Sequence, residues 1–146
     1  PERPSQAPAR AGGSGAQVAT GGTIDPAGQC VQPTVLTGVS VGDRVWADEV
    51  FGPVVSVKSY ADLDEAFHLA NSTQYGLQAG IYTNDLGVTL QAAEKLRFGG
   101  VTVNETPTFR VDQMPYGGTK ESGNTREGPH YTVRAMTEER MIVVGR

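Results

Sequence analysis

Two short stretches of this 146-residue chain carry side chains that could bind a ligand. In the first, Glu49 and Phe51 stand two residues apart, directly ahead of Gly52-Pro53. A carboxylate has two acceptor oxygens that match two neighbouring hydroxyl donors. The residue before a proline is displaced from the helical region, so Gly52-Pro53 is expected to fix the backbone that presents both side chains. From the residues alone, Glu49 is interpreted as a surface acid and Phe51 as a core residue.

The second stretch is the segment that contains Phe109, Arg110 and Tyr116. An arginine fork suits the carboxylate or phosphate of a ligand. The alternative is a structural salt bridge from Arg110 to Asp112 or to another acid. Tyr116 likewise has two interpretations, as a wall of a ligand pocket or as a ring that packs against Gly117-Gly118.

Cys30 and the two histidines are the remaining residues with reactive side chains. No basic residue lies within four positions of Cys30 to lower the pKa of its thiol, so it is not assigned as a nucleophile. One cysteine and the distant His68 and His130 make no plausible metal site. The sequence therefore predicts no catalytic residue and no metal ligand in this chain.

Composition excludes several classes of protein. Sixteen acidic and twelve basic residues give a formal net charge of −4, without the basic stripe typical of nucleic-acid binding. No apolar run approaches the ~18–20 residues that span a bilayer. The single cysteine fits a reducing cytoplasm. We expect a cytoplasmic protein that binds neither nucleic acid nor membranes.

The N-terminal part of the chain differs in composition from the remainder. Residues 1–22 are rich in Pro, Ala, Gly and Ser and show neither helical nor strand periodicity, which predicts a flexible lead-in. Gly13-Ser14-Gly15 lacks the third glycine and the preceding strand of a dinucleotide loop. Residues 23–146 are expected to form the folded part.

Two helices are predicted after a strand that begins at Val54. Asp62 caps the first, with Glu65 returning three residues on. Asp85 caps the second, and Gly99-Gly100 is expected to end it with a positive φ. The apolar faces expected to be buried are Leu63, Ala66, Phe67 and Ala70 in the first helix and Leu86, Leu90, Ala93 and Leu96 in the second.

Strands alternate with these helices. Runs at 54–60, 77–82 and 101–104 are strand candidates, so the sequence predicts an α/β fold with a largely parallel sheet flanked by helices. Met141 to Val144 is apolar on both faces and predicts a terminal strand that needs a partner sheet, in this chain or in another subunit.

Several segments in order resemble signature segments of one family. They are Gly22, Gln32-Pro33-Thr34-Val35, Glu49 to Val54, Asn71 with Tyr75-Gly76-Leu77, Gly100 to Asn104, and Pro115 to Gly128. Together they resemble the C-terminal part of an NAD(P)-dependent aldehyde dehydrogenase. One departure is Asn124-Thr125-Arg126, where the family usually has a glycine before the arginine; Thr125 is expected to strain this turn.

The resemblance implies oxidation of an aldehyde to a carboxylic acid with NAD or NADP. It implies that Glu49 accepts hydrogen bonds from the nicotinamide ribose hydroxyls and that Phe51 lies against the nicotinamide ring. It also places Phe109 and Tyr116 at the aldehyde tunnel. Arg110 lies in a loop similar to that of a subgroup in which it faces small polar or anionic aldehydes.

Nothing in the chain resembles the family's nucleophilic cysteine segment, its general-base glutamate segment or its dinucleotide-binding half. The chain is therefore expected to be a fragment that is inactive alone. The alternative is a non-catalytic oligomerisation or interaction module derived from the family. In either case we expect a homo-oligomer that forms through the Met141–Val144 strand.

Overall fold

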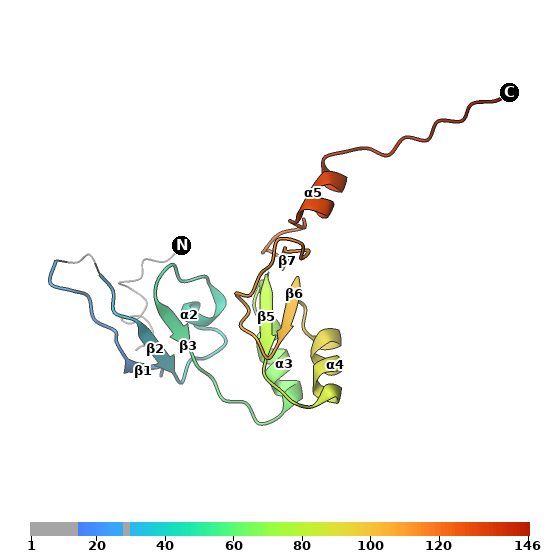
Figure 1. Ribbon diagram of the computed structural model, residues 1–146. Coiled ribbons are helices and arrows are strands. Elements are labelled where there is room, and N and C mark those ends of the chain that lie inside the picture. Colours follow the sequence, from blue (N-terminus) through green and yellow to red (C-terminus); the bar gives the residue numbers. More distant parts are fainter. Residues whose placement is uncertain (1–14, 28–29) are drawn as a thin grey trace. The chain divides into compact units, whose positions relative to one another are not determined.

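The computed structural model describes residues 15–27 and 30–146, and it divides the chain into two compact units (Figure 1). The first unit is Pro1–Thr73 and the second is Gln74–Arg146. The boundary expected after residue 22, between a lead-in and the folded part, stays a prediction. Most of the expected lead-in, including Gly13-Ser14, lies outside the described residues.

The first unit contains a three-stranded sheet in the order β1-β2-β3. Its strands are β1 (Gln17–Thr20), β2 (Thr34–Thr37) and β3 (Val54–Ser56). β1 pairs antiparallel with β2, whereas β3 pairs parallel with β2. The unit also has two helices. α2 (Arg44–Ala47) lies between β2 and β3 in the chain, and α3 (Leu63–Asn71) comes after β3.

The core of the first unit is small. Ala16, Leu36 and Val39 are buried and pack with three half-buried residues, Val45, Trp46 and Val54. β1 and the buried Ala16 lie in the segment for which the sequence predicts neither helix nor strand. Because all four residues of β1 are exposed, its sequence carries no burial periodicity, and its backbone is paired with β2.

Helix α3 forms as its capping residues predict. The Asp62 Oδ1 atom accepts a hydrogen bond from the Glu65 amide at 2.9 Å. Glu65 returns to the amide of Ala61 at 2.6 Å, one residue earlier than a standard capping box. Phe67 is buried, and Leu63, Ala66 and Ala70 are half-buried, which confirms the expected apolar face.

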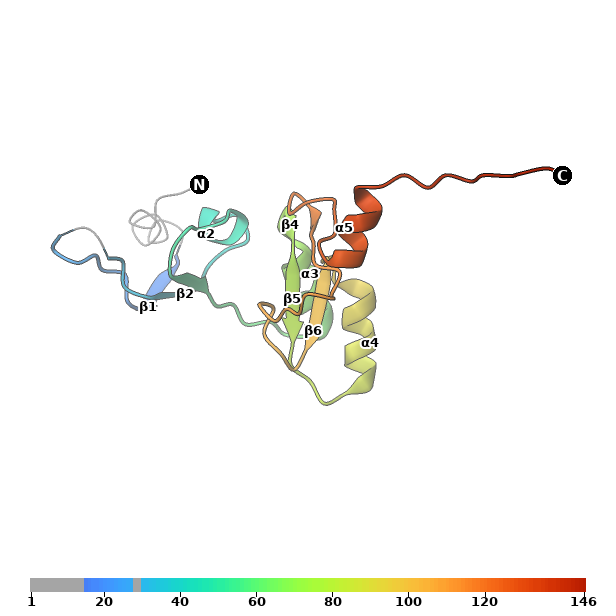
Figure 2. The same ribbon diagram turned by 45° about the horizontal axis from the view of Figure 1, so that its top comes forward.

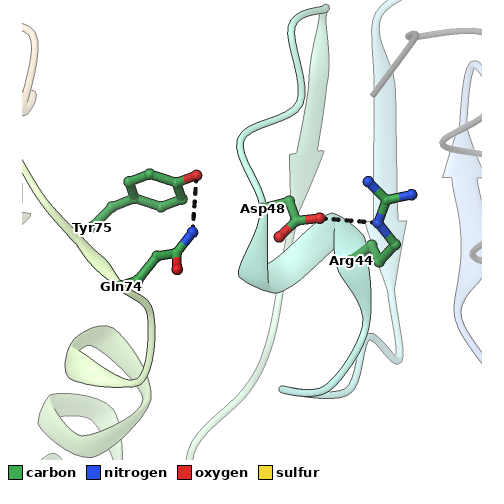
Figure 3. Close-up of polar contacts among 4 residues, drawn as sticks. All are labelled: Arg44, Asp48, Gln74 and Tyr75. Carbon is green, nitrogen blue, oxygen red and sulfur yellow. Dashed lines mark hydrogen bonds and ion pairs between the residues drawn. The ribbon is translucent and has the colours of Figure 1, made fainter. Parts of the chain in front are cut away.

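The second unit contains two pairs of strands. β4 (Tyr75–Gly76) pairs antiparallel with β7 (Thr119–Lys120), and β5 (Gln78–Ile81) pairs parallel with β6 (Gly100–Val103). Helix α4 (Leu86–Lys95) connects β5 to β6 and lies beside β6, and α5 (Pro129–Ala135) follows β7 (Figures 1 and 2). The Gln74 side-chain amide donates to the Tyr75 hydroxyl at 3.2 Å where β4 begins (Figure 3).

The α/β class is confirmed, but the single largely parallel sheet is not. The sheets are small and mixed, with two parallel and two antiparallel pairings. The parallel pairings arise where a helix connects two strands, as in β2-α2-β3 and β5-α4-β6. β4 and β7 instead meet across a long connection, which permits the antiparallel direction.

The buried face of α4 differs from the predicted one. Leu86 and Leu90 are 72% and 62% exposed, whereas Ala92 is fully buried and Val88 is half-buried. The cap is as predicted, because the Asp85 carboxylate accepts from the amides of Gly87 and Val88. A helix with apolar residues on two faces buries the face that its neighbouring strand selects, and a small residue at Ala92 permits the closest approach.

Gly99 and Gly100 have a different role from the predicted one. Helix α4 ends before them, with Leu96 as its C-cap at φ −78°, and neither glycine is among the residues with positive φ. A Cβ atom on Gly99 would lie 1.6 Å from the Gly117 carbonyl oxygen. Gly99 is therefore required by a close approach of two backbones, not by a helix-ending turn.

The expected terminal strand is absent among the described residues. Met141 to Val144 have no regular secondary structure and are 78–86% exposed, and the segment runs away from α5 (Figure 2). A strand exists only with a hydrogen-bonded neighbour, and no described residue pairs with this segment. Within the described residues, no helix is both long and apolar enough to span a membrane.

Candidate functional site

The segment that carries Glu49 and Phe51 begins at the end of α2. An ion pair joins the first residue of α2 to its C-cap residue: Arg44 Nε lies 2.9 Å from Asp48 Oδ2 (Figure 3). The Asp48 amide also donates to the Arg44 carbonyl at 2.8 Å. These two contacts fix the residue directly before Glu49, so the chain leaves the helix in a defined direction.

Two consecutive tight turns follow. The Gly52 amide donates to the Val50 carbonyl at 2.9 Å, and the Val54 amide donates to the Gly52 carbonyl at 2.8 Å. Phe51 and Pro53 are the central residues of these three-residue turns. The Thr34 amide donates to the Pro53 carbonyl at 2.8 Å, which anchors the second turn to β2.

Thr34 is the buried polar residue on which this anchor depends. It is 1% exposed. Its hydroxyl donates to the Gln32 carbonyl at 2.8 Å and accepts from the Gly22 amide at 2.9 Å. Both hydrogen-bonding roles of the hydroxyl are therefore satisfied in the interior. The expectation that Gly52-Pro53 fixes the backbone agrees with these contacts.

The side chains of this turned segment face solvent. Phe51 is 60% exposed, so the interpretation of Phe51 as a core residue is wrong. Glu49 is exposed, and its carboxylate has no hydrogen bond or ion pair with the described part of the chain. An unpaired carboxylate and an exposed aromatic ring thus stand two residues apart on an anchored backbone.

Arg110 has two partners within the second unit. Its Nη2 atom lies 2.8 Å from Glu127 Oε2, and its Cζ atom lies 4.3 Å from the centroid of the Tyr116 ring. The ion pair is partly exposed, with 42% of the Arg110 and 61% of the Glu127 side chain accessible. Of the two interpretations of Arg110, the structure contains the salt bridge, and its partner is Glu127 instead of Asp112.

Glu127 and Tyr116 are themselves joined by the backbone. The Glu127 amide donates to the Tyr116 carbonyl at 2.6 Å, and the Tyr116 amide donates to the Glu127 carbonyl at 3.2 Å. Directly opposed residues of an antiparallel pair project to the same face. The ring and the carboxylate are therefore held side by side, and both contact the same guanidinium.

The loop before Arg110 is organised by Asn104. Its side chain accepts from the Thr83 amide at 2.8 Å and donates to the Thr83 carbonyl at 2.9 Å, and its φ is +56°. Asn104 thereby joins the ends of β5 and β6. Phe109 is 44% exposed, and its amide donates to the Thr106 carbonyl at 3.0 Å.

The backbone of the glycine-rich loop after Tyr116 has no positive φ at Thr125. Lys120, at +54°, and Gly123, at +127°, take that conformation. The Arg126 Nη1 atom donates to the carbonyls of Gly118 at 2.7 Å and Thr125 at 2.9 Å. Arg126 is therefore a structural residue that ties this loop to the start of α5, whose N-cap is Gly128.

A pocket of about 640 Å³ lies beside α5 in the second unit. Arg110, Asp112 and Glu127 supply its charged lining, and Val133 and Met136 supply an apolar wall. Phe109 and Tyr116 are not among its lining residues, so their assignment to an aldehyde tunnel stays a prediction. The structure brings Arg110 and Tyr116 together, and Glu127 completes the cluster.

Glu127 was not identified as a site residue from the sequence. It lies 17 positions from Arg110, beyond the range in which sequence spacing implies contact. Cys30 is free and exposed, and its amide donates to the Asp25 carboxylate at 2.8 Å. Across residues 15–27 and 30–146, no group of three or more His, Cys, Asp or Glu side chains could hold a metal ion.

Comparison with known proteins identifies the family. The sequence pattern of the aldehyde dehydrogenase family matches residues 3–142. The 3-sulfolactaldehyde dehydrogenase of Priestia aryabhattai is 47% identical over 130 residues, which are 89% of this chain and 27% of that protein.

Two solved structures share the fold. Aldehyde dehydrogenase 21 from Physcomitrella patens, in complex with the reaction product succinate, has a TM-score of 0.88 at 40% identity and covers 92% of this chain. Glyceraldehyde-3-phosphate dehydrogenase GapN from Methanocaldococcus jannaschii, complexed with NADP, has a TM-score of 0.82 at 38% identity and covers 90%. This chain covers 28% of each. It spans little more than a quarter of its relatives' length, and it belongs to the aldehyde dehydrogenase family.

Proposed function

We propose that this chain supplies the C-terminal part of the catalytic domain of an NAD(P)-dependent aldehyde dehydrogenase that oxidises a small polar or anionic aldehyde to a carboxylic acid. The activity belongs to a longer enzyme, since the relatives are more than three times as long as the matched segment. Alone, the chain is expected to show no turnover, because nothing in its sequence resembles the family's nucleophile or general-base segments.

The cofactor-binding part of the proposal rests on Glu49 and Phe51. The observation that carries it is the unpaired Glu49 carboxylate, two residues from a 60% exposed aromatic ring on an anchored backbone. Two carboxylate oxygens fit the two hydroxyls of a ribose, and an exposed ring fits a flat heterocycle. The nicotinamide, when bound, supplies the hydride acceptor. NADP bound to the GapN relative supports a dinucleotide cofactor.

The substrate part rests on Arg110. Its guanidinium lines the pocket beside α5 and has N–H groups beyond the one directed at Glu127. Two relatives are named for 3-sulfolactaldehyde and glyceraldehyde-3-phosphate, and a third was solved with succinate. Each of these three small molecules has an anionic group. An arginine fork is the side chain that best matches such oxyanions.

The test of the cofactor role uses the longer enzyme that contains this segment. Glu49→Gln removes the charge and keeps the shape, so KM for NAD(P) is expected to rise by about 10- to 100-fold, the range for a lost charge-assisted hydrogen bond. Glu94→Gln, an exposed acid on α4, is the matched control and should leave KM unchanged. Equal KM values for the Glu49→Gln enzyme and the unmodified enzyme would remove Glu49 from the cofactor site.

A second candidate function is a non-catalytic oligomerisation module. It is favoured by Met141 to Val144, whose apolar side chains are 78–86% exposed. Four adjacent apolar residues gain by pairing with a sheet of another copy. Size-exclusion chromatography of the chain with and without residues 141–144 tests it: association should be lost on deletion. A monomer in both forms would contradict the module.

A further inference from the structure

Helix α2, which ends two residues before Glu49, is too short to hold its own position. It contains four residues, Arg44–Ala47, and none of them is fully buried. A single helical turn gains too few hydrogen bonds to offset the entropy of ordering its backbone, so its stability comes from contacts with the rest of the protein. The direction in which the chain leaves α2, and with it the place of the Glu49 carboxylate, therefore depends on those contacts.

Trp46 anchors α2 in two ways. Its half-buried side chain packs against the core cluster of Ala16, Leu36 and Val39. Its Nε1 atom donates a hydrogen bond to Ser72 Oγ at 3.1 Å. The indole nitrogen is a donor only, and a partly buried indole usually has an acceptor for it. Trp46 is therefore held both by apolar packing and by its one polar atom.

The acceptor of this hydrogen bond is itself fixed. Ser72 is the C-cap residue of α3. Its amide donates to the Leu69 carbonyl at 3.2 Å, and its hydroxyl donates to the same carbonyl at 2.6 Å. The hydroxyl hydrogen is thus committed to Leu69, and the oxygen remains an acceptor for Trp46. The short helix α2 is in this way joined to the end of the longer helix α3.

Two further contacts hold the segment around Glu49. Ser56 Oγ donates to the Val45 carbonyl at 3.3 Å, which joins α2 to β3. The Thr34 amide donates to the Pro53 carbonyl and anchors the far end of the turned segment. Glu49 lies between these anchors, and its carboxylate has no polar partner in the described part of the chain. The anchors, and not contacts of its own, therefore place this carboxylate.

We propose that Trp46 is a positioning residue for the nicotinamide cofactor: its hydrogen bond to Ser72 holds α2 so that the Glu49 carboxylate meets both hydroxyls of the nicotinamide ribose. Trp46 acts through Glu49. This inference rests on the proposed cofactor role of Glu49. A carboxylate that accepts from two adjacent hydroxyls tolerates little displacement, because hydrogen bonds weaken steeply as their geometry departs from the ideal.

Trp46→Phe tests the hydrogen bond with little change in packing, because it keeps an aromatic ring against the core and removes the N–H group. The hydrogen bond to Ser72 is exposed, so its contribution lies in the lower part of the usual range. KM for NAD(P) should rise by about threefold, and KM for the aldehyde should stay unchanged. Ser72→Ala removes the acceptor and should raise KM for NAD(P) by a similar factor.

The experiment is a double-mutant cycle in the longer enzyme that contains this segment. KM for NAD(P) and for the aldehyde is measured for Trp46→Phe, for Glu49→Gln and for the double variant. If Trp46 acts through Glu49, the two changes are not additive, and Trp46→Phe should alter KM by less than about 1.5-fold once Glu49→Gln is present. Tyr60→Phe, which removes the polar atom of a 56% exposed ring in the same unit, is the matched control and should leave both KM values unchanged.

The outcomes separate this inference from the proposed function. A threefold rise in KM for NAD(P) both with and without Glu49→Gln would show that Trp46 does not act through Glu49. An unchanged KM in Trp46→Phe, or an equal rise in KM for the aldehyde, would also overturn the positioning role. In these cases a raised KM in Glu49→Gln alone would leave the proposed cofactor site intact. If Glu49→Gln does not raise KM for NAD(P), both the cofactor role and the inference fail.

Discussion

The Glu49–Phe51 turn and the Arg110 cluster are built in opposite ways. In the turn, backbone hydrogen bonds and the buried Thr34 hold the chain, while the Glu49 carboxylate and the Phe51 ring make no polar contact with the described part of the protein. In the cluster, the functional side chains contact one another: Arg110 pairs with Glu127 and lies over Tyr116. One region presents unpaired groups, and the other presents groups that are already paired.

This difference has a consequence for how each region binds ligands. A ligand at Glu49 displaces only water, so its affinity depends on how well the backbone fixes the carboxylate. A ligand at Arg110 shares or replaces an existing partner, so its affinity depends on competition with Glu127. Changes to the Glu49 or Phe51 side chain should therefore alter binding without altering stability, whereas changes in the second region should alter both.

The largest expected effect comes from breaking the backbone frame of the second region. Gly99→Ala would place a Cβ atom 1.6 Å from the Gly117 carbonyl oxygen, in the backbone next to Tyr116. A shift of the Gly99 backbone would break a hydrogen bond, because the Gly99 amide donates to the Gly76 carbonyl. The free energy of unfolding of the second unit should fall by about 3 kcal/mol, at the upper end of overpacking effects.

Hydrogen exchange distinguishes the two units in this variant. The amide of Gly100, bonded to the Leu77 carbonyl, should exchange faster, and the amide of Val57, bonded to the Leu36 carbonyl, should be unaffected. Gly42→Ala is the control, since nothing lies within 4 Å of its added Cβ and its φ is not positive. Unchanged exchange at Gly100 in Gly99→Ala would refute the close approach of the two backbones.

The parts of the fold that could be predicted from the sequence are those set by neighbours in the chain. Asp62 and Asp85 cap helices because the amides they accept from lie two or three residues on. The α/β class also follows from the alternation of helices and strands.

The errors concern contacts between distant residues. Two faces of α4 carry apolar side chains, and the helix periodicity alone does not show that Ala92 is buried and Leu90 exposed. The close approach of Gly99 to Gly117 spans 18 residues and leaves no local pattern. For the candidate site, the residue types at Arg110 and Tyr116 were recognised, but Glu127 entered only once the structure brought position 127 opposite position 116.

The first region can be loosened with a smaller effect. Thr34→Val keeps the volume and β-branching of the side chain and removes its hydroxyl, so the Gly22 amide loses its acceptor and the Gln32 carbonyl loses its donor. Thr34 is 1% exposed, but both hydrogen bonds are only part-buried, so water replaces them in part. The free energy of unfolding of the first unit should fall by about 1–2 kcal/mol, the lower part of the range for polar groups left unpaired.

The matched control is Thr20→Val, the same change on an exposed position of β1, which should shift stability by no more than about 0.5 kcal/mol. Exchange of the residue 34 amide, which donates to the Pro53 carbonyl, reports directly on the turn. Faster exchange there, with the Gly100 amide unchanged, would mean that the frame under Glu49 and Phe51 depends on one buried hydroxyl. If the Thr34→Val and Thr20→Val variants are equally stable, the Thr34 hydroxyl does not stabilise the turn, and the turn's own backbone hydrogen bonds are what hold it.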